Sequence, residues 1–205
     1  ESNISLLAIN ENGLFKPVIG EASIKDGATA LLEVDRKYLP GEFVLRFDYK
    51  EKETSTSYPC EQRLIIGRQD LELWANPMFC NNPDSNWDSP GELENNAFKA
   101  FAEESYRQKG QLGLLEQFLV GYQDYGSKFY RQAVREYESR RSEHNNWLTH
   151  QIKKDNALFV SNLYTLQYIP ETEWEGTQEV RIISMINHYF DGADLSEEAL
   201  TKTSQ

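Results

Sequence analysis

The sequence holds 205 residues, with 21 Lys and Arg against 33 Asp and Glu, so its formal net charge at neutral pH is −12. This length allows one large domain or two small ones, and it suffices for an apolar core without metal or disulfide support. The acidic balance argues against nucleic acid or an anionic membrane as the main partner, since both bind clustered positive charge. The 10 Phe, 11 Tyr and 4 Trp nevertheless indicate a folded protein, because disordered acidic chains lack aromatic residues.

The first 75 residues have the alternation and turn signals of β-structure. The pairs Asn-Gly at 12–13 and Asp-Gly at 26–27 are typical of two-residue hairpin loops, which need a positive φ at both positions. Pro17 places the second strand at an edge or a bulge, since proline has no N–H to donate to a neighbour. About six short strands are expected, in an antiparallel β-sandwich, at 4–9, 14–24, 29–34, 42–49, 62–66 and 70–74.

A segment rich in turn formers separates this half from the rest of the chain. Residues 76–91 hold three of the seven prolines together with several Asn and Asp, and they are predicted to form a linker. Residues 92–205 have helical periodicity and are predicted to form a helical domain of four or five helices. The expected fold class is therefore α+β, with a β-sandwich domain at 1–75 followed by an all-helical domain.

Capping residues and apolar spacing place the individual helices. Ser89, with Glu92 three residues later, predicts that the first helix starts there. Gly110 and Gly113 are expected to interrupt it before a second helix, and Ser127 is expected to cap a longer third helix. The seam expected along that third helix is Tyr130, Val134, Tyr137, Arg141, His144, Leu148 and Ile152. The apolar positions of a last helix are Val180, Ile183, Ile186 and Phe190.

No motif in the sequence assigns a reaction. Glycine-rich phosphate loops, a serine nucleophile elbow and a paired-histidine zinc motif are all absent, and no cofactor or metal site is expected. His144 falls on the apolar seam and is expected to be a hydrogen-bonded core or edge histidine. Adjacent carboxylates such as Glu103 and Glu104 are more typical of a solvated helix face than of paired-carboxylate catalysis. The chain is therefore expected not to be an enzyme, and hydrolysis by scattered carboxylates is the least favoured alternative.

Two groups of residues are candidates for a disulfide and for a binding surface. Cys60 and Cys80 lie twenty residues apart and form no C-x-x-C motif, so a structural disulfide and two unrelated thiols remain equally compatible with the sequence. Trp74, Phe79 and Trp87 lie among Asn and Asp side chains, a combination that can stack on and hydrogen-bond a sugar or a peptide. The alternative is that these aromatic side chains cover the seam between the two halves.

One motif near the C-terminus is more specific than the others. It is Asn-His-Tyr-Phe-Asp-Gly-Ala-Asp-Leu-Ser at 187–196, and weaker matches lie at 38–45, 64–73, 92–96 and 153–166. With these residues the chain resembles the N-terminal region of bacterial cell-envelope thioredoxin-like lipoproteins of the thiol-disulfide oxidoreductase type. In that family a C-terminal thioredoxin-like domain carries the W-C-x-x-C redox motif, and this sequence reaches Gln205 without one.

The resemblance implies export to the periplasm or the outer-membrane surface, with an N-terminal lipid anchor outside this chain. It implies a non-catalytic role, in which the chain positions or recognises partners for a redox domain that it lacks. The expected partners are that C-terminal domain and envelope proteins. No apolar run approaches the ~20 residues of a membrane span. The alternative is a stand-alone glycan- or peptide-binding module that uses the aromatic residues of 74–87.

Overall fold

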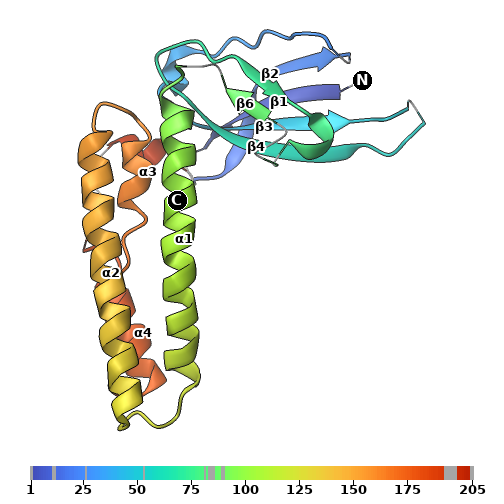
Figure 1. Cartoon of the computed structure of the whole chain (residues 1–205). Helices are drawn as coiled ribbons and strands as arrows, with labels where there is room; N and C mark the ends of the chain where they lie inside the picture. The colour runs from blue at the N-terminus through green and yellow to red at the C-terminus, as the bar shows by residue number, and fades with distance from the viewer. Residues whose placement is uncertain are drawn as a thin grey trace. The chain divides into compact units, whose positions relative to one another are not determined.

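The computed structural model describes residues 2–10, 13–25, 27–52, 54–80, 82, 86–88, 91–191 and 198–203, and they fall into two compact units (Figure 1). The first unit holds the described residues of Glu1–Asn96, Leu158–Val160 and Glu197–Gln205. The second holds those of Ala97–Ala157 and Ser161–Ser196. The first is built around a sheet and the second from helices, so the α+β class expected from the sequence is confirmed.

Four antiparallel strands form the sheet of the first unit, in the order β2-β1-β3-β4. Their bounds are β1 (Ser2–Ile9), β2 (Phe15–Ile24), β3 (Gly41–Tyr49) and β4 (Tyr58–Ile66). The β1–β2 hairpin turns at Gly13, whose φ of +70° suits a residue without a Cβ atom. Pro17 lies in edge strand β2, next to a register shift against Leu7 and Ile9, as its missing N–H predicted.

The sheet has fewer strands than the predicted sandwich. Residues 29–34 form no strand, although Leu32 and Val34 pack against the sheet core. Their alternation therefore records one buried face, which an extended segment can have without pairing. The strand expected at 70–74 is the short β5 (Leu73–Ala75), which pairs with β6 (Asn86–Asp88) in a separate two-stranded ribbon.

The main apolar cluster of the first unit lies on one face of the sheet, while Val44 and Ile65 are buried on the other. Its buried apolar side chains come from three strands and are Ile4, Leu6, Ala8, Phe43, Leu45, Phe47 and Leu64. Half-buried side chains from 32–39 and 71–75 pack onto them, together with the fully buried Cys80. These covering segments include two 3-10 helices, η1 (Arg36–Tyr38) and η2 (Pro77–Phe79). The core is thus completed by irregular chain rather than by a second large sheet.

The helices are α1 (Glu94–Gly121), α2 (Lys128–Lys154), α3 (Ser161–Thr165) and α4 (Gln178–Asn187), with a 3-10 helix η4 (Glu198–Lys202) near the C-terminus. Within the second unit, α1 and α2 form an antiparallel hairpin, with α4 beside them towards the end where α1 runs into α2 (Figure 1). Ser127 caps α2 as predicted, since its Oγ accepts a hydrogen bond from the Tyr130 N–H at 3.0 Å. The predicted seam of α2 is confirmed, with Tyr130, Tyr137, Arg141, His144 and Leu148 buried.

Side chains at and just before the beginning of α1 make hydrogen bonds within the first unit. The Asn95 amide donates to the Ile65 carbonyl at 2.8 Å and accepts from the Ile65 N–H at 2.7 Å, so it pairs with β4 as a strand would. The buried Glu94 carboxylate accepts from the N–H groups of Phe159 and Val160, both at 2.9 Å. Glu92 caps the helix, because its carboxylate accepts from the N–H groups of Glu94 and Asn95 at 2.9 and 2.7 Å.

The first helix differs from its prediction in two ways. It begins at Glu94 and not at Ser89, which lies outside the described residues. It also continues through Gly110 and Gly113, where the sequence predicted a break. Each glycine costs a helix interior about 1 kcal/mol relative to alanine. That cost is outweighed by the burial of neighbouring side chains on α1, which include Leu112 and Leu119.

Within the described ranges, no helix combines the length and the apolar character that crossing a membrane would need.

The glycines of α1 provide a stability test. A Cβ added at Gly113 meets no atom within 4 Å, so Gly113→Ala is expected to raise the free energy of unfolding by about 0.5–1 kcal/mol. Gly91 is the matched control: it is equally open, but its φ of +90° disfavours a side chain, and Gly91→Ala is expected to lower stability. Urea denaturation followed by circular dichroism measures both. A destabilised Gly113→Ala variant would contradict the continuous helix.

Candidate functional site

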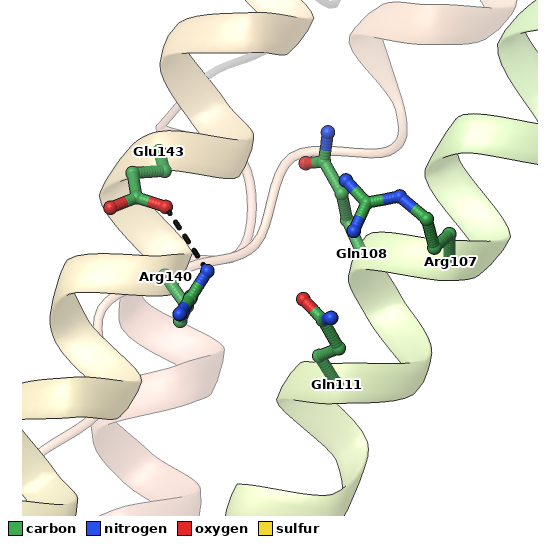
Figure 2. Close-up of a pocket in the computed structure, with 5 residues that line it drawn as sticks. All are labelled: Arg107, Gln108, Gln111, Arg140 and Glu143. Atoms are coloured by element: carbon green, nitrogen blue, oxygen red, sulfur yellow. Dashed lines mark ion pairs between the residues drawn. The ribbon is translucent and has the colours of Figure 1, made fainter.

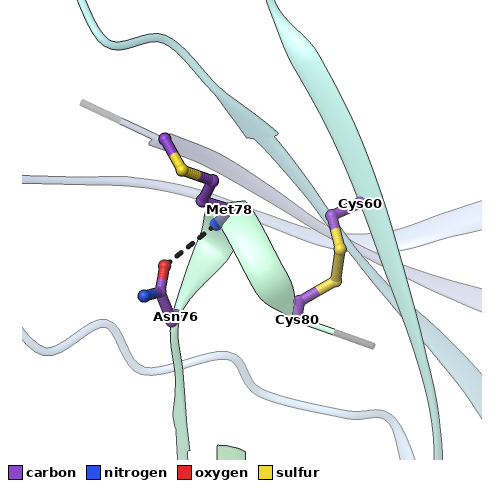
Figure 3. The surroundings of a disulfide bond; sticks show 4 residues. All are labelled: Cys60, Asn76, Met78 and Cys80. Carbon is purple, nitrogen blue, oxygen red and sulfur yellow. Dashed lines mark hydrogen bonds between the residues drawn. A yellow bond between two sulfur atoms is a disulfide. The ribbon is translucent and has the colours of Figure 1, made fainter. Parts of the chain in front are cut away.

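The aromatic residues proposed from the sequence are exposed in part. Trp74 in β5 and Phe79 in η2 are 51% and 50% exposed. Trp87 in β6 is the direct register partner of Trp74 across the ribbon, although its side chain lies outside the described part. Asn76 fixes the start of η2, since its Oδ1 accepts from the Met78 N–H at 3.1 Å (Figure 3). The fold therefore brings both tryptophan positions together on one ribbon.

A disulfide joins Cys60 of β4 to Cys80, which follows η2 (Figure 3). The two Cα atoms lie 6.0 Å apart, and the Cys80 side chain is fully buried in the sheet core. The sequence left this bond and two separate thiols equally open. The bond holds the end of η2 to an edge strand, and the half-exposed Met78 and Phe79 lie on this anchored segment. Sequence reasoning missed Met78 and the exposed Tyr58, which lies two residues before Cys60.

A small cleft lies between α1 and α2 in the second unit (Figure 2). Its volume is about 80 Å³, and its lining residues are Arg107, Gln108, Gln111, Arg140 and Glu143. Both guanidinium groups already have carboxylate partners: Arg140 donates to Glu136 at 2.9 Å and lies 3.7 Å from Glu143. Arg107 donates two hydrogen bonds to Glu104, at 2.8 and 2.6 Å. The cleft therefore offers space for water but no unpaired positive charge for an anion.

A chain of hydrogen bonds leads from this cleft to His144. Glu104 accepts from Arg107 and from Gln108 Nε2, and these bonds lower the pKa of Glu104 to about 2. Because its amide nitrogen faces Glu104, Gln108 presents its Oε1 to His144 Nδ1 at 2.9 Å. Both ring nitrogens thus face oxygen acceptors, since Nε2 lies 3.4 Å from the Gln167 carbonyl oxygen. Burial lowers the pKa of His144, which favours the neutral imidazole.

This network stabilises the helix pair. His144 is fully buried, so a substrate has no access to it, and the expectation of a hydrogen-bonded core histidine is confirmed. Lys109 donates to the Gln167 side chain at 2.5 Å, which adds a second polar link between α1 and the chain after α3. Across the described ranges, no three His, Cys, Asp or Glu side chains gather closely enough to hold a metal ion.

Exposed apolar side chains gather on α4 and on the turn that directly follows it. Ile182 is 47% exposed, Ile186 66% and Tyr189 61%, although the sequence suggests a helix that buries its apolar positions. A groove of about 430 Å³ runs along them. We call its lining residues the α4 stripe: Ile182, Met185, Ile186, Tyr189 and Phe190. Ile182, Met185 and Ile186 share one side of α4 by their i, i+3 and i+4 spacing, and Tyr189 and Phe190 lie in the turn that follows.

Polar side chains of α4 hold the helix to the rest of the unit. Arg181 is buried, and its guanidinium lies over the Trp174 ring at 5.7 Å from the centroid. Ser184 Oγ accepts from the Glu173 N–H at 3.0 Å. Trp174 is itself fixed, because its carbonyl oxygen accepts from the Tyr130 hydroxyl at 3.1 Å. The usual arrangement is therefore reversed, with polar groups of α4 turned inward and apolar groups turned to solvent.

The buried His144 predicts a pH dependence of stability. Its folded-state pKa lies below 6.5, so the unfolded chain binds a proton more readily and stability falls as the pH drops below about 6.5. The slope contributed by this residue is at most about 1.4 kcal/mol per pH unit. Denaturation at pH 7.5 and 5.5 is expected to show a smaller loss for His144→Gln than for the wild type. The exposed His150→Gln is the control, and parallel behaviour of all three proteins would refute the assignment.

Comparison with protein-family models, with curated proteins and with solved structures finds no match to this chain. The resemblance carried by the motif at 187–196 therefore remains an expectation from the sequence. The geometry offers three surfaces for consideration: the half-exposed aromatics of 74–79, the small cleft between α1 and α2, and the α4 stripe. Of these, the α4 stripe has the largest apolar groove.

Proposed function

We propose that this chain is a non-catalytic interaction region of an exported, cell-envelope thioredoxin-like protein. In this role it positions or recognises partners on behalf of a redox domain located elsewhere in the same protein. The observation that carries the proposal is the exposed α4 stripe. Contiguous exposed apolar surface marks interaction sites in soluble proteins, because water makes such exposure unfavourable.

The energetics of the α4 stripe support binding. Full burial of one Ile or Phe side chain contributes about 1.5–3 kcal/mol, and a micromolar complex needs about 8 kcal/mol in total. Five side chains that are each exposed in part supply a comparable gain before the entropy of association is subtracted. Such a surface therefore supports a moderate affinity for a protein partner.

One further observation supports the envelope location, and a second links the family resemblance to the exposed surface. The Cys60–Cys80 bond is of the kind that persists in oxidising compartments, to which the periplasm belongs. The motif at 187–196, on which the family resemblance depends, also supplies Tyr189 and Phe190 of the α4 stripe. One short segment thus links the resemblance to the exposed surface.

The reading frame beyond codon 205 tests this proposal. We expect it to encode a W-C-x-x-C motif, and we expect the protein made from the complete frame to reduce a model disulfide such as that of insulin. Residues 1–205 alone are expected to leave the rate at the buffer level, since the chain contains no C-x-x-C pair. A complete frame without such a motif, or turnover by residues 1–205 alone, would refute the proposal.

A second candidate, a stand-alone glycan- or peptide-binding module, is favoured by the ribbon geometry. Trp74 is half exposed, and its register partner across the ribbon is Trp87. Phe79 is half exposed on η2, which the neighbouring disulfide holds in place. Rigid aromatic side chains of this kind bind flat apolar sugar faces and peptide side chains with little loss of entropy.

Tryptophan fluorescence tests this second candidate. Titration with envelope oligosaccharides and short peptides is expected to change the emission, and Trp74→Ala is expected to weaken binding by about tenfold, or about 1.4 kcal/mol. Tyr106→Ala is the matched control, because Tyr106 is 83% exposed on α1. A Trp74→Ala variant with the wild-type affinity would remove the ribbon as the binding site.

A further inference from the structure

We propose that the α4 stripe is the docking surface for a basic amphipathic helix of a partner protein. This inference rests on the proposed interaction role and names the chemistry of the partner. It depends on two observations, the shape of the groove and the sign of the charge around it.

The groove is lined by one helix and the turn after it. Ile182, Met185 and Ile186 lie at helical spacing on α4, and Tyr189 follows in the turn. Tyr189 and Phe190 pack edge to face with their ring centroids 4.9 Å apart, so they form a firm aromatic end to the groove. A volume of about 430 Å³ has room for several large apolar side chains, such as one helix presents at i, i+3, i+4 and i+7.

The segment that carries the groove is acidic, and we call its carboxylates the rim. Residues 171–191 contain five acidic side chains and one arginine. That arginine, Arg181, is buried over Trp174 and so adds no exposed positive charge to this segment. Glu171 is paired with Arg141 at 3.3 Å. Glu179 lies one turn before Ile182 and is exposed, and the exposed Asp191, which lies 2.6 Å from His188 Nδ1, directly follows Phe190. Lys and Arg side chains flanking an apolar helix face would lie against this rim, which favours a basic partner.

Charge also decides against two other occupants. An anionic membrane would be repelled by the acidic rim, and a membrane-surface helix needs basic residues beside its apolar face. A second copy of this chain would bring two acidic rims together, on molecules that each have a formal charge of −12. The basic amphipathic helix is the occupant that satisfies both the apolar groove and its rim.

The test uses a fluorescein-labelled peptide of about 14 residues, with Leu at i, i+3, i+4 and i+7 and Lys at the other positions. Its control replaces every Lys with Glu. Fluorescence anisotropy with the whole chain is expected to show the Lys peptide binding at least about tenfold more tightly, and more weakly as salt rises. Ile186→Asp is expected to reduce affinity for the Lys peptide about tenfold, although the substitution adds a negative charge. Leu31→Asp, at an 85% exposed position of the first unit, is expected to bind as the wild type.

Several results would overturn the inference. Equal binding of the Lys and Glu peptides would show that the acidic rim has no role, and unchanged affinity in Ile186→Asp would place binding elsewhere. A dimer in sedimentation velocity that Ile186→Asp dissociates would make a second copy the occupant. Binding to phosphatidylglycerol vesicles that Ile186→Asp abolishes would make it a membrane. If the Lys peptide does not bind but the reading frame contains C-x-x-C, this inference is overturned. The proposed function would then still stand.

Discussion

The hydrogen bonds of Asn95 and Glu94 are the constraint on which the first unit depends. Asn95 bonds both backbone groups of Ile65, and Glu94 receives two backbone N–H groups from Phe159 and Val160. Consecutive residues of one helix therefore connect an edge strand to a turn that lies 65 and 66 residues after Glu94. Because these side chains are buried, removing either partner would leave backbone groups unsatisfied, at about 1–3 kcal/mol for each.

Local signals in the sequence predicted the elements that depend on local interactions. Ser127 and the seam of α2 are examples, because a cap and a helical stripe are both set by residues a few positions apart. Residues 29–34 were predicted wrongly, since alternation reports burial and does not report pairing. The start of α1 was also misplaced, because Glu94 and Asn95 bond to residues 30 to 66 positions away in the sequence.

The candidate site also has features that the sequence reveals and features that depend on contacts distant in the sequence. The apolar positions predicted for the last helix included Ile186 and Phe190 of the α4 stripe, but not Ile182, Met185 or Tyr189. The aromatics Trp74 and Phe79 were named from composition. The sequence did not reveal that the apolar side of α4 faces solvent, because a stripe looks the same whether it is covered or open. That outcome depends on Arg181 and Ser184, which bond to the segment around Trp174 and turn the opposite side of the helix outward.

The two edges of the sheet restrict how this protein can associate. Strand β2 carries Pro17 next to register shifts, and strand β4 carries Pro59, so each edge lacks at least one N–H that an added strand would need. At Ile65 the Asn95 side chain already occupies both backbone groups. Edge-to-edge growth into fibrils or domain-swapped sheets is thus disfavoured. At high protein concentration the two edges therefore resist polymerisation through strand pairing.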